Sequence, residues 1–159
     1  MAGEIFQSTF TVNELIKAAT VAITAGEIIR LGEYKIQAGE QISAGAGQLT
    51  GMDNATGRIY MDLRDSTTSP GAALSGAVRL VVYSAQNRPL EIIREWRTED
   101  LATSATDKTK QLPFPEHSIW LREDQRLVLE FIPDTGGAGN GNVSKANSKI
   151  LMAVTKQAL

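Results

Sequence analysis

The sequence predicts an all-β fold, a two-sheet antiparallel sandwich built as a single jelly roll of about eight strands with long crossover loops. Two runs, residues 76–96 and 119–133, alternate between two sets of side chains, which is typical of strands that have one face on a core. Short links such as residues 85–89 carry the residue types that tight turns use. Three longer connections suit a jelly roll better than a meander: residues 44–57, 66–75 and 98–111.

The alternation divides the two central runs into two faces. Side chains two residues apart on a strand point to the same side of the sheet, so one set can pack on the core while the other faces away. One face carries Val78, Leu80, Val82, Leu127, Leu129 and Phe131, and the opposite face carries Arg79, Val81, Tyr83, Arg126, Val128 and Glu130.

The N-terminal quarter begins with residues 1–12, which are predicted to form an arm or a first strand, followed by a single domain over residues 13–159. Phe6 and Phe10 are the candidate anchors of this arm. Asn13 is a suitable N-cap for a short helix over residues 13–19, although a strand start there is an equal alternative. Further short strands are predicted at residues 20–24, 34–37 and 41–43.

The remaining elements are also strands and connections. Residues 58–65 alternate, with Ile59, Met61 and Leu63 expected to point inward. Residues 76–84 and 90–97 are predicted to form a hairpin. Two more segments complete the pattern: an extended, proline-rich piece at 112–115, and a last strand at 149–156 that places Ile150, Met152 and Val154 on one face.

Composition narrows the function classes. The 159 residues fit one domain, and 42% hydrophobic content supports a core. The formal charge is -2 without a basic cluster, which argues against sequence-specific nucleic-acid binding. The absence of cysteine excludes disulfides and thiolate chemistry. The first residues predict no secretory leader, and no apolar run approaches the ~20 residues of a membrane-spanning helix.

No group of residues suggests catalysis or a cofactor. The single histidine, His117, cannot supply a metal site of the cupin type, which needs several histidines. Among the acidic pairs, Asp62 and Asp65 are predicted on opposite strand faces, whereas Glu91 and Glu95 are predicted to share a face as part of a solvated ion-pair surface. The chain is therefore expected not to be an enzyme and to need no cofactor.

Two binding hypotheses remain. Residues 134–142, DTGGAGNGN, form an oxygen-rich loop that invites a calcium interpretation, but Asp134 is its only carboxylate and a mobile surface loop is the favoured alternative. Trp96 and Trp120 are candidate stacking platforms for a carbohydrate. Because each lies in an alternating strand, a place in the core or in a subunit interface is the commoner outcome.

Several phrases of the sequence resemble small single jelly-roll capsid proteins of archaeal and bacterial icosahedral viruses. The resemblance runs over residues 31–154 and is carried by five phrases: GRIYMDLRD at 57–65, RLVVYS at 79–84, RPLEII at 88–93, LPFPEH at 112–117 and LREDQRLVLE at 121–130. It implies a capsid subunit that assembles with copies of itself or a paralogue into an icosahedral shell, in some cases above an internal membrane. In that setting Phe6 and Phe10 become a candidate strap between subunits. The alternatives are a capsid decoration protein and a β-sandwich carbohydrate-binding module.

Overall fold

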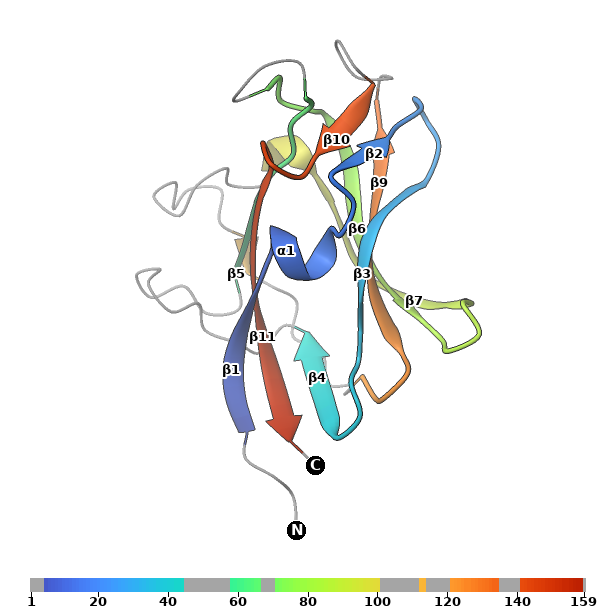
Figure 1. Ribbon diagram of the computed structural model, residues 1–159, viewed down its shortest axis with the longest axis vertical. Helices are drawn as coiled ribbons and strands as arrows, with labels where there is room; N and C mark the ends of the chain where they lie inside the picture. Colours follow the sequence, from blue (N-terminus) through green and yellow to red (C-terminus); the bar gives the residue numbers. More distant parts are fainter. Residues whose placement is uncertain are drawn as a thin grey trace.

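Two antiparallel sheets pack face to face in the computed structural model, which describes residues 5–44, 58–66, 71–100, 112–113, 121–134 and 141–158 (Figure 1). Apart from one short helix and one 3-10 turn, the regular elements in these residues are strands, so the predicted all-β sandwich is confirmed. No helix in the described ranges is long and apolar enough to cross a bilayer.

The first sheet is centred on β11 and is called the β11 sheet here. Its order is β1-β11-β5-β8, and β4 pairs with the far end of β11. The strands are β1 (Ile5–Thr11), β4 (Glu40–Ala44), β5 (Arg58–Asp62), β8 (Leu112–Pro113) and β11 (Lys149–Ala158). The last strand is the longest because it has to reach β5 with one half and β4 with the other.

The second sheet is centred on β9 and is called the β9 sheet. Its order is β3-β9-β6-β7, with every pair antiparallel. The strands are β3 (Ile29–Lys35), β6 (Gly76–Tyr83), β7 (Pro89–Arg97) and β9 (Arg126–Pro133). A separate short pair, β2 (Thr20–Ala22) with β10 (Asn142–Ser144), lies at one end of the sandwich (Figure 1).

The strand order is that of a jelly roll. The strand β4 lies off the main path of its sheet, and β2 and β10 form a separate pair. Among the other strands, neighbours such as β1 and β11 or β3 and β9 are far apart in sequence, and the chain crosses repeatedly between the sheets. In the β9 sheet only β6 and β7 are consecutive neighbours, and they form the predicted hairpin through a turn at residues 84–88. Asn87 adopts φ 62° in this turn, a left-handed conformation that asparagine tolerates better than most residues.

The core lies between the two sheets and draws on both. All six side chains predicted on one face of the central strands are buried: Val78, Leu80, Val82, Leu127, Leu129 and Phe131. Met61, Leu63 and Ile150 reach the same cluster from β5, the segment after it and β11. Each fully buried aliphatic or aromatic side chain of this kind contributes about 1.5–3 kcal/mol to folding.

A four-residue helix, α1 (Val12–Leu15), caps the core between the sheets (Figure 1). The helix predicted at residues 13–19 therefore exists but begins one residue earlier and is shorter. Its role is to deliver Leu15 and Ile16, both 0% exposed, into the core. It rests directly on β3 at Gly32, where an added Cβ would lie 1.6 Å from the carbonyl oxygen of Leu15.

One strand begins earlier than expected, and one strand was not expected. β3 occupies Ile29–Lys35 in place of residues 34–37, because a register shift between Arg30 and Gly32 interrupts the alternation that marks a strand. The strand β10 was not predicted, since three residues after a glycine-rich loop carry little periodic signal. Of the crossover loops predicted at residues 44–57, 66–75 and 98–111, residues 45–57, 67–70 and 101–111 lie outside the described residues.

Candidate functional site

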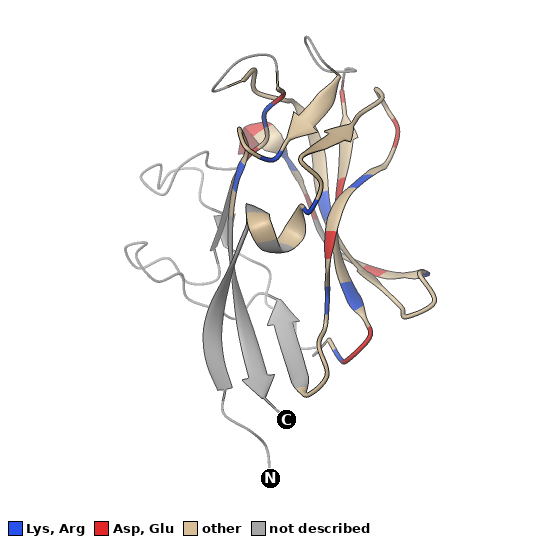
Figure 2. Ribbon diagram, viewed as in Figure 1, with Lys and Arg blue, Asp and Glu red and all other residues tan. Residues whose placement is uncertain are grey.

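The outward face of the β9 sheet carries a row of alternating charges. Cross-strand register aligns Arg30 of β3 with Glu130 of β9, Glu130 with Arg79 of β6, and Arg79 with Glu95 of β7. Residues directly opposite one another in an antiparallel pair share a face of the sheet. Because Val78 and Leu80 on either side of Arg79 lie in the core, the charged row is on the outer face. Acidic and basic positions on β3, β7 and β9 are marked in Figure 2.

Glu130 is the centre of this row and is 3% exposed. Its Oε1 accepts hydrogen bonds from Nε and Nη2 of Arg79, at 3.1 and 2.8 Å, and its Oε2 accepts one from the Tyr83 hydroxyl at 2.5 Å. This hydrogen bond to Glu130, aided by burial, raises the pKa of Tyr83 above its ordinary value. A buried carboxylate is stable only with such partners, so the Arg79–Glu130–Tyr83 network fixes the middle of the face.

A second group of residues covers this network from β3. The Arg30 guanidinium lies 4.3 Å from the centre of the Tyr83 ring, within the range of a cation–π contact. Its Nη1 is 3.9 Å from Oε2 of Glu33, and Nε of Arg126 is 3.6 Å from the same oxygen. Five charged residues of this face are thus paired within the chain: Arg30, Glu33, Arg79, Arg126 and Glu130.

The next row of the same face is apolar and becomes exposed toward β7. Val128, Val81 and Ile92 are aligned across β9, β6 and β7. The two valines are buried at 0% and 1%, although the sequence pattern places them away from the core and they are not part of the core cluster. The apolar stems of long charged side chains commonly cover such neighbours on the outer face of a sheet. Ile92 is 49% exposed and Leu90, two residues earlier, is 56% exposed. An edge strand with two exposed large apolar residues is a site that a partner normally covers.

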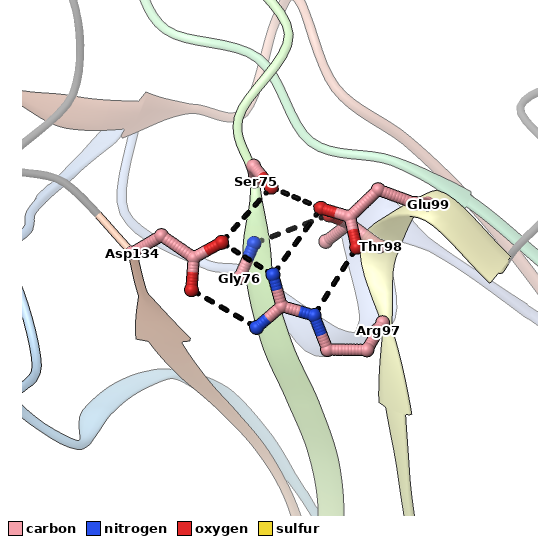
Figure 3. A network of polar contacts seen from close by, with 6 residues as sticks. All are labelled: Ser75, Gly76, Arg97, Thr98, Glu99 and Asp134. Atoms are coloured by element: carbon pink, nitrogen blue, oxygen red, sulfur yellow. Dashed lines mark hydrogen bonds and ion pairs between the residues drawn. The ribbon is translucent and has the colours of Figure 1, made fainter.

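A polar network also joins the ends of β6, β7 and β9 (Figure 3). Arg97 donates from Nε to Glu99 at 3.1 Å and from Nη1 to Asp134 at 2.9 Å, and its Nη2 also reaches the Asp134 carboxylate. The Ser75 hydroxyl lies between the two acids and contacts Glu99 and Asp134. The arginine therefore bridges two carboxylates that follow different strands, a pairing that sequence spacing did not indicate.

The network makes stability sensitive to acid. The pKa of Glu99 is lowered mainly by its hydrogen bond with Ser75 and next by its hydrogen bond with Arg97. The pKa of Asp134 is lowered mainly by its hydrogen bonds with Arg97 and, to a smaller extent, by the one with Ser75. A carboxyl whose pKa is lower in the folded state stabilises the fold above its unfolded pKa, and this contribution is lost as the pH falls through the folded value. We expect Asp134→Asn to melt below the wild type near pH 7, and the two melting temperatures to converge as the pH falls below 3.8, the ordinary pKa of an aspartate, and through the lowered value of the folded state. Thermal melts across this range test it, with Glu123→Gln as an exposed carboxyl control; a gap that is constant with pH would contradict it.

The calcium hypothesis concerns residues 134–142, of which residues 135–140 lie outside the described part of the chain, so the structure bears on it mainly through Asp134. The carboxylate of Asp134 is already bound to the Arg97 guanidinium, and no group of three or more metal-binding side chains occurs in the described ranges. We expect millimolar CaCl₂ to leave the melting temperature of the wild type unchanged relative to MgCl₂ at the same concentration. A calcium-specific rise of several degrees would show that the ion displaces Arg97.

The residues considered for catalysis and glycan binding are dispersed. Asp65 is fully buried and its Oδ1 accepts a hydrogen bond from the Ala72 amide, while Asp62 pairs with Arg64 at 2.9 Å. The prediction that Glu91 and Glu95 share a face is wrong. A register shift on β7 aligns Glu91 with Val82, of the core-facing set, and Glu95 with Arg79, of the outer set.

The two tryptophans and the histidine do not form a visible binding site. Trp96 is 4% exposed and belongs to the core cluster, so its ring is not a stacking platform on the surface. His117 and Trp120 lie outside the described residues. The glycan hypothesis therefore loses one of its two candidate platforms.

The candidate arm residues lie on the edge of the β11 sheet. β1 pairs with β11 along its whole length, with Phe6 opposite Lys156 and Phe10 opposite Met152. Residues 5–11 are thus placed as a strand of their own domain, one of the two predicted alternatives. Whether the opposite edge of this strand also binds a neighbouring subunit stays a prediction.

The fold of the chain is similar to that of two solved structures. VP17, a capsid protein of bacteriophage P23-77, aligns with a TM-score of 0.63 and 11% identity over 100% of this chain and 99% of that chain. A chain of the VP16-VP17 complex, the complex of the two major capsid proteins of the same phage, aligns with a TM-score of 0.58 and 12% identity over 99% of this chain and 100% of that chain. No protein-family model and no curated protein matches the sequence. At these identities, the similarity establishes the fold over the full length of the chain.

Proposed function

We propose that the protein is a viral capsid subunit that assembles into an icosahedral shell. The observation that carries the proposal is the end-to-end similarity of its fold to VP17, with 100% of this chain and 99% of that chain aligned. Because the match spans both chains from end to end, the shared unit is the whole jelly roll. A jelly roll by itself serves many functions, so the proposal also needs support from the surface.

The described surface is suited to holding neighbours. Each sheet has at least one long edge strand that pairs on one side only within the described residues, β1 in the β11 sheet and β7 in the β9 sheet. Soluble monomers usually protect such edges, whereas assembling subunits use them. β7 also exposes Leu90 and Ile92, and Arg79 and Glu130 on the outer face are already paired with each other. A partner can therefore cover this pair without leaving either of its charges uncompensated.

The partners proposed are further copies of the chain and a second capsid protein. The VP16-VP17 complex contains the two major capsid proteins of its phage, and this chain aligns with that complex over 99% of its length. The place of action is then the capsid of a virion, and the role is structural. Catalysis is not part of the proposal, since the acidic side chains of the described residues are engaged in ion pairs or dispersed.

Light scattering on the purified chain at increasing concentration, followed by negative-stain imaging, tests the proposal. We expect multimers that grow with concentration, alone or after a second capsid protein is added. A chain that stays monomeric under all these conditions but binds preformed capsids would be a decoration protein. A monomer that ignores capsids altogether would contradict the proposal.

A further inference from the structure

We propose that two copies of the chain associate through the outer face of the β9 sheet, around a twofold axis parallel to its strands. The inference rests on the proposed function and specifies one contact surface for it. The surface is centred on the charged row Arg30, Glu130, Arg79 and Glu95, with Ile92 at its apolar edge and Glu33, Lys35, Tyr83 and Arg126 beside it.

The charged row is complementary to itself. Across β3, β9, β6 and β7 it reads positive, negative, positive, negative. A twofold axis parallel to the strands reverses the strand order in the second copy, so that β3 lies opposite β7 and β9 lies opposite β6. Residues of one row still lie opposite residues of the same row in the second copy. Arg30 then lies opposite Glu95 of the second copy, and Glu130 lies opposite its Arg79. Each of the four charges in this row therefore lies opposite a charge of the other sign. A row that reads the same in both directions, such as positive, negative, negative, positive, would instead place like charges opposite each other.

The two outer members of the row are the ones able to form new contacts. Glu130 and Arg79 are 4% and 17% exposed in their side chains and already bind each other. The side chain of Arg30 is 32% exposed, and Glu95 is an exposed residue of the edge strand. Two symmetric Arg30–Glu95 pairs would therefore form the margins of the interface.

The neighbouring rows are compatible with the same arrangement. Val128 and Val81 are 0% and 1% exposed within each copy, so the middle of the second row brings no charge to the contact, and only Ile92 at its β7 end presents apolar surface. Arg126 lies opposite the Tyr83 ring of the second copy, a favourable cation–π partner. The adjacent positive residues Lys35 and Arg126 face β7 and β6 of the second copy, so neither faces a Lys35 or an Arg126 of that copy. Glu33 lies opposite Ile92, and its charge is already paired with Arg30 and Arg126 of its own chain.

The size of the face predicts a weak contact. Four strands about 4.8 Å apart and eight residues long at about 3.3 Å each cover roughly 500 Å² per copy. The total of about 1,000 Å² is at the lower limit for a specific interface. We expect a dissociation constant in the micromolar range or weaker. Such a weak contact is sufficient in a shell, because many contacts together hold the shell.

Two charge-reversal variants, measured separately and as a mixture, test the inference. Sedimentation of the full chain over a wide concentration range measures the association constant for the wild type, Arg30→Glu, Glu95→Arg and an equimolar mixture of these two variants. Each variant alone would place like charges opposite each other and is expected to associate at least about tenfold more weakly. In the mixture, the introduced glutamate of one variant meets the introduced arginine of the other, so association should return to within a few fold of the wild type. Circular dichroism confirms that each variant is folded.

Mixing separates the interface from effects inside one chain. Arg30→Glu also removes the contact with Tyr83, and Glu95→Arg places a positive charge beside Arg79, but neither change is repaired by adding a second protein. Arg88→Glu, an exposed charge in the turn between β6 and β7, is the control and should associate as the wild type does. The inference would be overturned if either charge-reversal variant associated as strongly as the wild type. It would also be overturned if the association constant of the mixture did not return toward the wild-type value.

The same measurements test the proposed contact on the β9 sheet separately from the proposed capsid function. A wild type that forms multimers or particles unaffected by both reversals would overturn this contact and leave the capsid proposal standing. A wild type without self-association at any concentration would overturn the contact, and imaging with a second capsid protein would then decide the function separately.

Discussion

Replacing Gly32 by alanine is expected to lower the free energy of unfolding by about 3 kcal/mol, the upper part of the range for overpacking. The new Cβ would lie 1.6 Å from the Leu15 carbonyl oxygen and 2.9 Å from the Ile16 Cα, both backbone atoms that cannot rotate away. Helix α1 would have to move off β3, and this would withdraw Leu15 and Ile16 from the core. Urea unfolding followed by fluorescence measures the loss.

Gly26→Asn is the matched control for this substitution. Gly26 has φ +74° and no atom within 4 Å of the position that a Cβ would take, and asparagine tolerates the left-handed conformation. Its unfolding free energy should change by less than about 1 kcal/mol. If Gly32→Ala were as stable as this control, the close packing of α1 on β3 would be disproved.

Replacing Glu130 by alanine is expected to lower the free energy of unfolding by about 3 kcal/mol, because removal of one partner of a buried pair leaves the other uncompensated. Arg79 would keep its charge at a site where only 17% of the side chain is exposed, and the Tyr83 hydroxyl would lose its acceptor. Urea unfolding at low protein concentration avoids any contribution from association.

Two further variants show whether the uncompensated charge of Arg79 causes the loss of stability in Glu130→Ala. Glu95→Ala removes the other acidic neighbour of Arg79, but this residue is exposed, so the expected loss is below about 1 kcal/mol. The double variant Glu130→Ala with Arg79→Met removes the stranded charge and should recover part of the loss. A double variant less stable than Glu130→Ala alone would mean that packing, rather than charge, holds this part of the face together.

The central strands were predictable because their pattern is local. Period-two alternation assigned Leu80, Leu129 and Phe131 to a face that the structure places in the core. The hairpin of β6 and β7 was predictable for the same reason, since its turn residues lie between its strands. The long last strand β11 also follows directly from its apolar pattern.

What the sequence could not predict depends on contacts between distant segments or on a single inserted residue. The pairing of β1 with β11 joins opposite ends of the chain, and no local pattern encodes it. The register shift on β7 moves Glu91 and Glu95 to opposite faces, which strict alternation cannot foresee. The bridging of Glu99 and Asp134 by Arg97 requires β7 and β9 to end at the same place.

The candidate surface was predictable only in part. Tyr83, Arg79 and Glu130 were assigned to the face opposite the core, and the structure confirms that assignment. Their arrangement into a row of alternating charges depends on the order β3-β9-β6-β7, which only the structure supplies. The burial of Glu130 likewise could not be predicted, because it arises from long side chains on two neighbouring strands.

Electron cryo-microscopy of the assembled protein tests most directly the proposal that this jelly roll is a building block of a viral shell. We predict closed particles whose repeating density fits the sandwich of the β9 and β11 sheets, with copies in contact along the surfaces described. If the purified chain, with or without a second capsid protein, formed no closed particle and occupied no position in one, the account would be contradicted.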